Sequence, residues 1–216
     1  MKKQFLKASS GAVKKCALLI VMTLLLLCLG ACGSSSKDAS QTDDSANQAS
    51  SGDSRVLVAY FSATGNTESI AEQIAEETNA DLFEIIPEDS YSSEDLDYSN
   101  DECRANKEQN DKNSRPEIKN SVEDMSQYDI VFIGHPIWWG EEPRIMDTFM
   151  ESYDFSQKTL VNFCTSGGSG IDTSTENLKA LSSDDAAWLT GHRFESGAGS
   201  DEINEWLKEL NLNFEE

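Results

Sequence analysis

Small polar residues join a predicted strand to a predicted helix near the start of the folded part of the chain. Residues 56–61 are a nearly continuous apolar run, and residues 62–67 follow with the sequence SATGNT. The first backbone N–H groups of a helix have no partner within the helix and attract anions. Because residues 62–67 include neither Lys nor Arg, we predict a phosphate site built from neutral donors. The spacing fits neither a Walker loop nor the dinucleotide fingerprint.

Two later loops carry residues suited to a flat ring. Residues 135–143 read HPIWWGEEP, and residues 164–170 read CTSGGSG. Adjacent tryptophans offer a surface for stacking, while a loop of Gly and Ser lets the backbone approach a ligand edge closely. Trp138 and Trp139 could instead pack in the interior against the next helix. Together with residues 62–67, the pattern favours a planar phosphorylated ligand.

Strand and helix patterns alternate from Arg55 onward, which predicts a doubly wound α/β domain with a parallel sheet. We expect strands at residues 56–61, 81–87, 128–136, 158–165 and, more weakly, 187–194. We expect helices at residues 67–78, 104–110, 143–152, 173–181 and 200–212, with Thr173 and Glu176 forming a capping box. Ligands of such sheets bind beyond the carboxyl ends of the strands, where all three loops are expected.

The motifs YFSATGNT, PIWWG and TSGGSG resemble those of the flavodoxins, in particular the secreted and lipoprotein forms, and the resemblance covers residues 55–212. It implies a five-stranded parallel sheet in the order 2-1-3-4-5, FMN as cofactor and electron transfer as activity. By the resemblance, three loops bind FMN: Ser62, Ala63, Thr64, Gly65, Asn66 and Thr67 at the phosphate; Pro136, Ile137, Trp138, Trp139 and Gly140 beside the isoalloxazine ring; and Thr165, Ser166, Gly167, Gly168 and Gly170 along its pyrimidine edge. The last loop departs from the family pattern because it lacks the tyrosine that commonly stacks on the ring.

Residues 88–127 form a segment that is long for a single crossover between strands. The segment is dense in charge and poor in large apolar residues. Loops beyond about 12 to 15 residues without regular structure tend to be functional or disordered. It is either a solvated loop with one short helix, or a flap that borders the flavin and includes Tyr98 and Arg104.

The first 31 residues have the pattern of a secretory signal. Five lysines precede an apolar run at residues 16–31, which is shorter than the roughly 20 residues of a membrane-spanning helix. The sequence LGAC at residues 29–32 resembles the lipobox of bacterial lipoproteins, which implies cleavage before Cys32 and lipidation of Cys32. The alternative is an ordinary thiol in an uncleaved anchor.

The predicted organisation is therefore a signal peptide at residues 1–31, a lipidated cysteine with a disordered Ser-rich linker at residues 32–54, and a folded domain at residues 55–216. The linker contains almost no apolar residue larger than alanine and cannot bury enough surface to fold. We expect the domain to lie outside the cytoplasm, held to the bacterial cell membrane by its lipid anchor.

The charge of the chain excludes some partners. Apart from the signal, 12 basic and 39 acidic residues remain, a formal charge of about −27. So acidic a domain repels nucleic acid and anionic lipid. The charge could serve solubility alone or steer a basic partner protein. No spacing of His, Cys or acidic residues predicts a metal site. Cys103 and Cys164 could pair outside the cell, but we expect them to be free, partly buried thiols.

The sequence leaves three functions open, and it identifies no catalytic residue for any of them. The domain is an FMN electron carrier, an NAD(P)H-dependent quinone or flavin reductase, or a flavin-free interaction module on the cell surface. The carrier would exchange electrons with a redox partner protein or a quinone-type acceptor. We assign no catalytic role to His135 or His192, although His135 could touch the flavin at the end of its strand.

Overall fold

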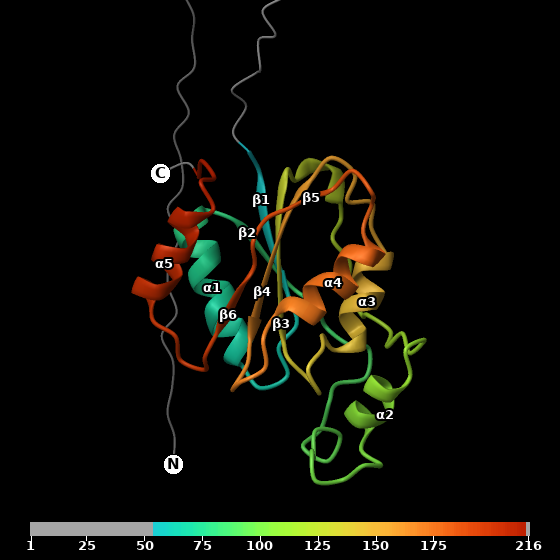
Figure 1. The fold of residues 1–216 in the computed structure, drawn as a ribbon. Coiled ribbons are helices and arrows are strands. Elements are labelled where there is room, and N and C mark those ends of the chain that lie inside the picture. The colour runs from blue at the N-terminus through green and yellow to red at the C-terminus, as the bar shows by residue number, and fades with distance from the viewer. Residues whose placement is uncertain (1–53, 215–216) are drawn as a thin grey trace, which may run out of the picture. The chain divides into compact units, whose positions relative to one another are not determined.

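A parallel β-sheet organises residues 54–214, the part of the chain that the computed structural model describes (Figure 1). Its strands are β1 (Val56–Tyr60), β2 (Asp81–Glu84), β3 (Ile130–Pro136), β4 (Thr159–Thr165), β5 (Ala187–Trp188) and β6 (His192–Phe194). The helices are α1 (Asn66–Thr78), α2 (Arg104–Asn110), α3 (Arg144–Glu151), α4 (Asp172–Leu181) and α5 (Ser200–Glu209), with a 3₁₀ helix η1 (Met125–Gln127). The predicted signal peptide, the lipidation of Cys32 and the linker up to residue 53 lie outside the described residues.

The strand order is β2-β1-β3-β4-β5, and every pairing is parallel. This order confirms the predicted flavodoxin-like sheet. The chain runs from β1 to β2 at one edge and then crosses back to β3 on the other side of β1. The carboxyl ends of β1 and β3 therefore flank the switch point at which ligands of such sheets bind.

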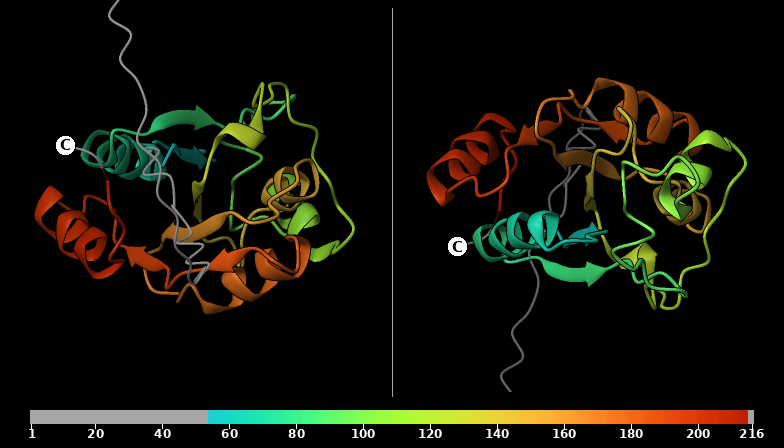
Figure 2. Two further views of the ribbon diagram at one scale, coloured as in Figure 1. Left: turned by 90° about the horizontal axis from the view of Figure 1, so that it is seen from above. Right: turned by 90° about the horizontal axis from the view of Figure 1, so that it is seen from below.

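Alternate residues of the strands face two separate hydrophobic cores, as the two-residue period of a strand requires. Helices α1 and α5 cover one face of the sheet, and α3 and α4 cover the other (Figures 1 and 2). Leu57 and Val131 pack in the core that contains Phe149 of α3. Val58 and Phe132 face the other core, formed with α1 and α5. The described residues contain no helix with the length and apolar character needed to cross a membrane.

The fifth position of the sheet is filled by two short strands instead of one continuous strand. Both β5 and β6 pair with β4, and residues 189–191 separate them. Gly191 lies so close to β4 that a Cβ atom there would meet the carbonyl oxygen of Asn162 at 2.5 Å. The backbone thus passes closer to β4 than a side chain would allow, and the strand is interrupted there.

The prediction that Thr173 and Glu176 form a capping box at the start of α4 is wrong. The helix begins at Asp172 after Ile171, and no side chain caps it. The Oγ atoms of Ser174 and Thr175 donate hydrogen bonds to the carbonyl oxygen of Ile171, at 2.8 and 3.0 Å. Because these bonds belong to a helix that has already started, Thr173 lies inside the first turn and cannot be its cap.

Cys103 and Cys164 are free, and both are more deeply buried than expected.

Candidate cofactor site

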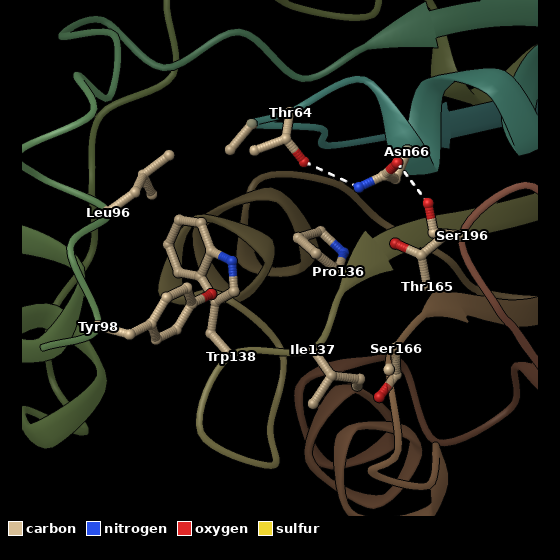
Figure 3. Close-up of a pocket in the computed structure, with 12 residues that line it drawn as sticks. Thr64, Asn66, Leu96, Tyr98, Pro136, Ile137, Trp138, Thr165, Ser166 and Ser196 are labelled. Atoms are coloured by element: carbon tan, nitrogen blue, oxygen red, sulfur yellow. Dashed lines mark hydrogen bonds between the residues drawn. The ribbon is translucent and has the colours of Figure 1, made fainter.

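A cavity of about 290 Å³ lies at the carboxyl ends of β1, β3 and β4. Nine of the predicted site residues line it: Ala63, Thr64, Asn66, Pro136, Ile137, Trp138, Thr165, Ser166 and Gly167 (Figure 3). Three more lining residues come from elsewhere, namely Leu96, Tyr98 and Ser196. The remaining predicted residues do not line the cavity: Ser62, Gly65, Thr67, Trp139, Gly140, Gly168 and Gly170. The structure thus brings the three predicted loops together and adds two segments to them.

One end of the cavity is polar and lies at the start of α1. Gly65 precedes the helix with φ +83° and offers no side chain to cap it, so the first N–H groups of α1 remain available to a ligand. Hydroxyl and amide groups surround this end: Asn66 Nδ2 donates to Thr64 Oγ1 at 3.1 Å, and Ser196 Oγ donates to Asn66 Oδ1 at 2.8 Å (Figure 3). These are the neutral donors and the uncapped helix end that fit a phosphate group.

Ser62 and Thr67 do not line the cavity, but their hydrogen bonds hold the loop that forms its polar end. The Oγ of Ser62 accepts a hydrogen bond from the backbone N–H of Gly65, at 3.1 Å, which holds the turn before α1. Thr67 is buried, and its Oγ1 shares a hydrogen bond of 2.8 Å with Thr165 Oγ1. That bond ties α1 to the end of β4. Thr67 therefore positions the loop in this structure, where we had expected direct contact with the phosphate.

The other end of the cavity is aromatic. Trp138 is only 3% exposed, and Figure 3 shows its indole beside Leu96 and Tyr98, away from the hydroxyl groups at the polar end. Its ring makes edge contacts with Phe61 and Tyr91, with ring centroids 5.6 and 5.2 Å apart. Both interpretations of this tryptophan hold, since it packs in the interior and also lines the cavity. A planar ring fits this end.

Trp139 behaves differently from its neighbour. It is 43% exposed and lies outside the cavity lining. Trp139 and Gly140 have φ values of +49° and +88°, and backbone hydrogen bonds join Trp138 and Glu141 in both directions, at 2.9 and 3.1 Å. This is the arrangement of a tight two-residue turn in which both central residues take positive φ.

The two histidines lie away from the cavity lining. His135 is fully buried, its Nε2 lies 3.0 Å from Asn162 Oδ1, and burial lowers its pKa to about 4. It is therefore neutral at physiological pH and braces β3 against β4. His192 sits near the surface with its Nε2 3.4 Å from Glu202.

No lining residue of the cavity carries a formal charge. Within residues 54–214, no group of three or more His, Cys, Asp or Glu side chains is arranged to hold a metal ion. The arrangement therefore suits a ligand with a phosphate at one end and a flat ring at the other, held by hydrogen bonds, a helix terminus and aromatic contact.

A family model described as flavodoxin matches residues 55–210. The chain belongs to the flavodoxin family. Among solved structures, this flavodoxin is similar to a protein of Bacteroides eggerthii described as a flavoprotein, with 42% sequence identity and a TM-score of 0.69, over 74% of this chain and 100% of that one. A similar protein of Bacteroides uniformis shares 37% identity, with a TM-score of 0.69, over 73% of this chain and 99% of that one.

A more distant structure shares the fold. A flavoprotein of Lactobacillus acidophilus, solved in complex with FMN, is 22% identical with a TM-score of 0.52, over 71% of this chain and 99% of that one. None of the curated proteins matches the chain significantly.

Leu96 and Ser196 are lining residues that the sequence analysis did not find. Ser196 follows β6 in a loop of Ser and Gly, and its position after a strand was a usable signal. Leu96 is an isolated apolar residue in the charged crossover segment, where no local pattern points to a site. Tyr98, predicted as a member of a flap, lines the cavity, whereas Arg104 does not.

Proposed function

We propose that this flavodoxin binds FMN in the cavity and carries electrons between partners. The observation that supports this most strongly is the division of one cavity into a polar end at the uncapped start of α1 and an aromatic end at Trp138. FMN has a phosphate and a flat ring at its two ends. The cofactor supplies the redox chemistry, and the chain supplies binding, orientation and electrostatics.

The residues have separate tasks in this proposal. Thr64, Asn66 and Ser196, with the first N–H groups of α1, hold the phosphate. Pro136, Ile137 and Trp138 lie along the ring, and Thr165 to Gly167 approach its edge. The complex of the Lactobacillus acidophilus flavoprotein with FMN, which has the same fold, supports this choice of cofactor.

An electron carrier fits the site better than an NAD(P)H-dependent quinone or flavin reductase. A reductase that uses NADPH would need, besides the site for FMN, basic side chains that bind the 2′-phosphate, and the lining of this cavity supplies none. A flavin-free interaction module would leave the uncapped helix end and the aromatic end without a purpose. We propose a redox partner protein or a quinone-type molecule as the acceptor.

The lipobox-like sequence at residues 29–32 supports a location for this activity. We propose that a lipid on Cys32 holds the protein at the outer face of a bacterial membrane, with residues 33–54 as a spacer. Metabolic labelling with a fatty acid would detect the lipid, and Cys32→Ser should abolish the label and release the protein from membranes.

An absorbance spectrum and a reductive titration test the function. The purified protein, supplied with FMN and passed through a desalting column, should keep a flavin spectrum. Stepwise addition of dithionite should then reduce the flavin in two separate one-electron stages. Direct passage from oxidised to fully reduced flavin, with rapid oxidation of NAD(P)H, would favour the reductase, and absence of flavin would favour the interaction module.

A further inference from the structure

Arg193 of β6 contacts the loop that follows β4, although it lies outside the cavity lining. Its Nη1 donates a hydrogen bond to the carbonyl oxygen of Ser166, at 2.8 Å. Ser166 lines the cavity (Figure 3), and no lining residue is itself charged. Within residues 54–214, Arg193 is the one basic residue whose side chain donates a hydrogen bond to a lining residue. A positive charge therefore lies one residue away from the uncharged lining.

Pairing within the sheet fixes the place of Arg193. Strand β6 pairs with the end of β4, with Arg193 opposite Cys164 and Phe194 opposite Thr165. The backbone N–H of Ser166, the next residue of the chain after β4, donates to the carbonyl oxygen of Phe194 at 3.0 Å. Both backbone polar groups of Ser166 are thus bonded to consecutive residues of β6. The short strand β6 therefore holds the start of the loop that we expect at the ring edge.

Side-chain packing contributes little to the position of the rest of this loop. Residues 167–170 are exposed, and a Cβ atom added at Gly167, Gly168 or Gly170 would meet no neighbouring atom within 4 Å. The loop therefore depends on the hydrogen bonds at Ser166 for its position beside the cavity, and one of these comes from the side chain of Arg193.

The charge of Arg193 is only weakly compensated. Its side chain is 30% exposed, and its acidic partner is Glu195, whose Oε1 lies 3.4 Å from Nη2 and whose side chain is 75% exposed. Ion pairs between exposed groups contribute little, because water and salt screen them. Glu195 therefore leaves most of the effect of this positive charge on the neighbouring loop.

A positive charge beside the ring of a cofactor changes the free energy of its reduction. A ring that takes up one electron without a proton gains one negative charge. A cation about 10 Å away attracts this charge, with a strength that depends on the effective dielectric constant. The chain as a whole carries a formal charge of −22, which opposes the same step. The local effect of Arg193 is therefore opposite to that of the overall charge.

We propose that Arg193 is a positioning residue for the cofactor ring and raises its reduction potential. The hydrogen bond to Ser166 holds the loop after β4 at the ring edge, and the charge of the guanidinium favours the reduced, negatively charged ring. The proposal rests on the proposed binding of FMN and deepens it, because it assigns part of the control of the potential to one residue outside the lining.

The test measures the reduction potentials of FMN bound to the full chain, by redox titration with reference dyes at several pH values. The stage whose potential does not vary with pH takes up an electron without a proton. Arg193→Gln removes the charge and keeps a hydrogen-bond donor. The affinity for the cofactor after that stage, relative to the affinity before it, should fall by about three- to tenfold. This change lowers the potential of that stage by about 30–60 mV.

Three further variants separate charge from structure. Arg193→Lys keeps the charge, and the same ratio of affinities should stay within about twofold of the wild type, or about 18 mV. Arg193→Met is a second neutral variant, which keeps an apolar stem and should lower the potential as Arg193→Gln does. Lys208→Gln removes an equal charge in the last turn of α5, outside the lining, and is the matched control with an unchanged potential. Thermal unfolding without FMN shows whether each variant is folded.

Each outcome supports the proposal or overturns it. Potentials of the neutral variants equal to that of Lys208→Gln, in a chain that does bind FMN, would overturn the role of Arg193 and leave the proposed function standing. A shift in Arg193→Lys as large as in Arg193→Gln would show that the charge is not the cause and would also overturn it. Failure of both neutral variants to fold would assign Arg193 to stability alone. A wild type without saturable FMN binding would overturn the proposed function as well.

Discussion

The two ends of the cavity are built in different ways. The polar end comes mainly from one short stretch, residues 62–67, where a loop runs directly into the N-terminus of α1. The aromatic end joins Trp138, in the loop after β3, to Leu96 and Tyr98 of the crossover segment, which lie about 40 residues away in the sequence. The polar end is therefore local geometry, and the aromatic end is a product of tertiary packing.

The electrostatics behind the two ends also differ. The side chains that line the polar end are neutral, although Glu68 lies nearby in the first turn of α1. The loop after Trp139, in contrast, leads into a buried charged cluster around Arg144. Its guanidinium lies 2.5 Å from Glu141, 3.4 Å from Glu142 and 3.6 Å from Asp147. Three carboxylates thus surround one buried cation, and Arg144 also donates to the carbonyl oxygen of Gln109 at 3.1 Å. We therefore expect substitutions of residues that line the polar end to change mainly the affinity for the ligand. Substitutions at or behind the aromatic end should change mainly the free energy of unfolding.

Trp138→Ala should have the largest effect on stability, because it removes the buried tryptophan of the aromatic end. Removing a buried tryptophan that contacts Phe61 and Tyr91 should lower the free energy of unfolding by about 3–5 kcal/mol. Urea denaturation without FMN measures the loss. If Trp138 contributed only to ligand contact, the stability would change by less than about 0.5 kcal/mol, and the distinction between the two ends would fail.

Thr64→Val and Thr67→Val compare a lining residue with a supporting one. Thr67→Val removes the partner of the buried Thr165 hydroxyl, and an unsatisfied buried group should cost about 1–3 kcal/mol of stability. Thr64→Val should leave stability nearly unchanged and weaken FMN binding by about tenfold, because its hydroxyl lines the polar end. Thermal unfolding without FMN and titration with FMN measure the two effects in both variants. A loss of stability in Thr64→Val together with a loss of affinity alone in Thr67→Val would contradict the structure.

Glu142→Gln tests the charged cluster behind the aromatic end. Burial, together with the nearby charge of Asp147, raises the pKa of Glu142 from 4.5 to about 7. Between these two pH values the folded protein keeps a proton that the unfolded chain releases, so this group lowers stability as pH rises. The stability of the variant relative to the wild type should thus be greater at pH 8 than at pH 5, by about 1–3 kcal/mol.

The measurement for Glu142→Gln is urea unfolding of both proteins at pH 5 and pH 8. Comparison with the wild type is necessary because His135, whose pKa is lowered to about 4, has the opposite effect: it destabilises the fold as pH falls below its usual value of 6.5. His135 is present in both proteins, and its contribution cancels in the difference. A difference independent of pH would show that Glu142 titrates normally.

Ser196→Ala should give the smallest effect. Its hydroxyl donates to Asn66 Oδ1 at 2.8 Å and orients that side chain at the polar end. Loss of one neutral hydrogen bond is worth about 0.5–1.5 kcal/mol, so FMN affinity should fall by a few-fold while stability stays close to that of the wild type. No change in affinity would remove Ser196 from the polar end.

The contrast between the two ends also explains what the sequence could predict. The positions of the strands followed from apolar periods, their order from the resemblance to the flavodoxins, and the cluster of residues 62–67 from one contiguous motif. The structure confirms the order and places Thr64 and Asn66 at the cavity. The break in the fifth strand was not predicted, because it depends on the contact of Gly191 with Asn162, a residue on another strand.

The sequence predicted the aromatic end of the cavity only in part. Adjacent tryptophans predicted a ring site, yet their separate positions arise from a turn with positive φ at Trp139 and Gly140. Leu96 lines the cavity from the crossover segment, which Tyr91 and Gln109 join to the loop of Trp138. These are long-range contacts, which leave no periodic signal in the local sequence.

The central claim is that the polar end binds the phosphate of FMN. Calorimetric titration of the wild type with FMN and with riboflavin, in buffer without phosphate, tests it most directly. Loss of the phosphate removes several charge-assisted hydrogen bonds, each worth about 1.5–3 kcal/mol, so riboflavin should bind about 100-fold more weakly or worse. Equal affinities for FMN and riboflavin would contradict the assignment of residues 62–67 and the start of α1 as a phosphate site.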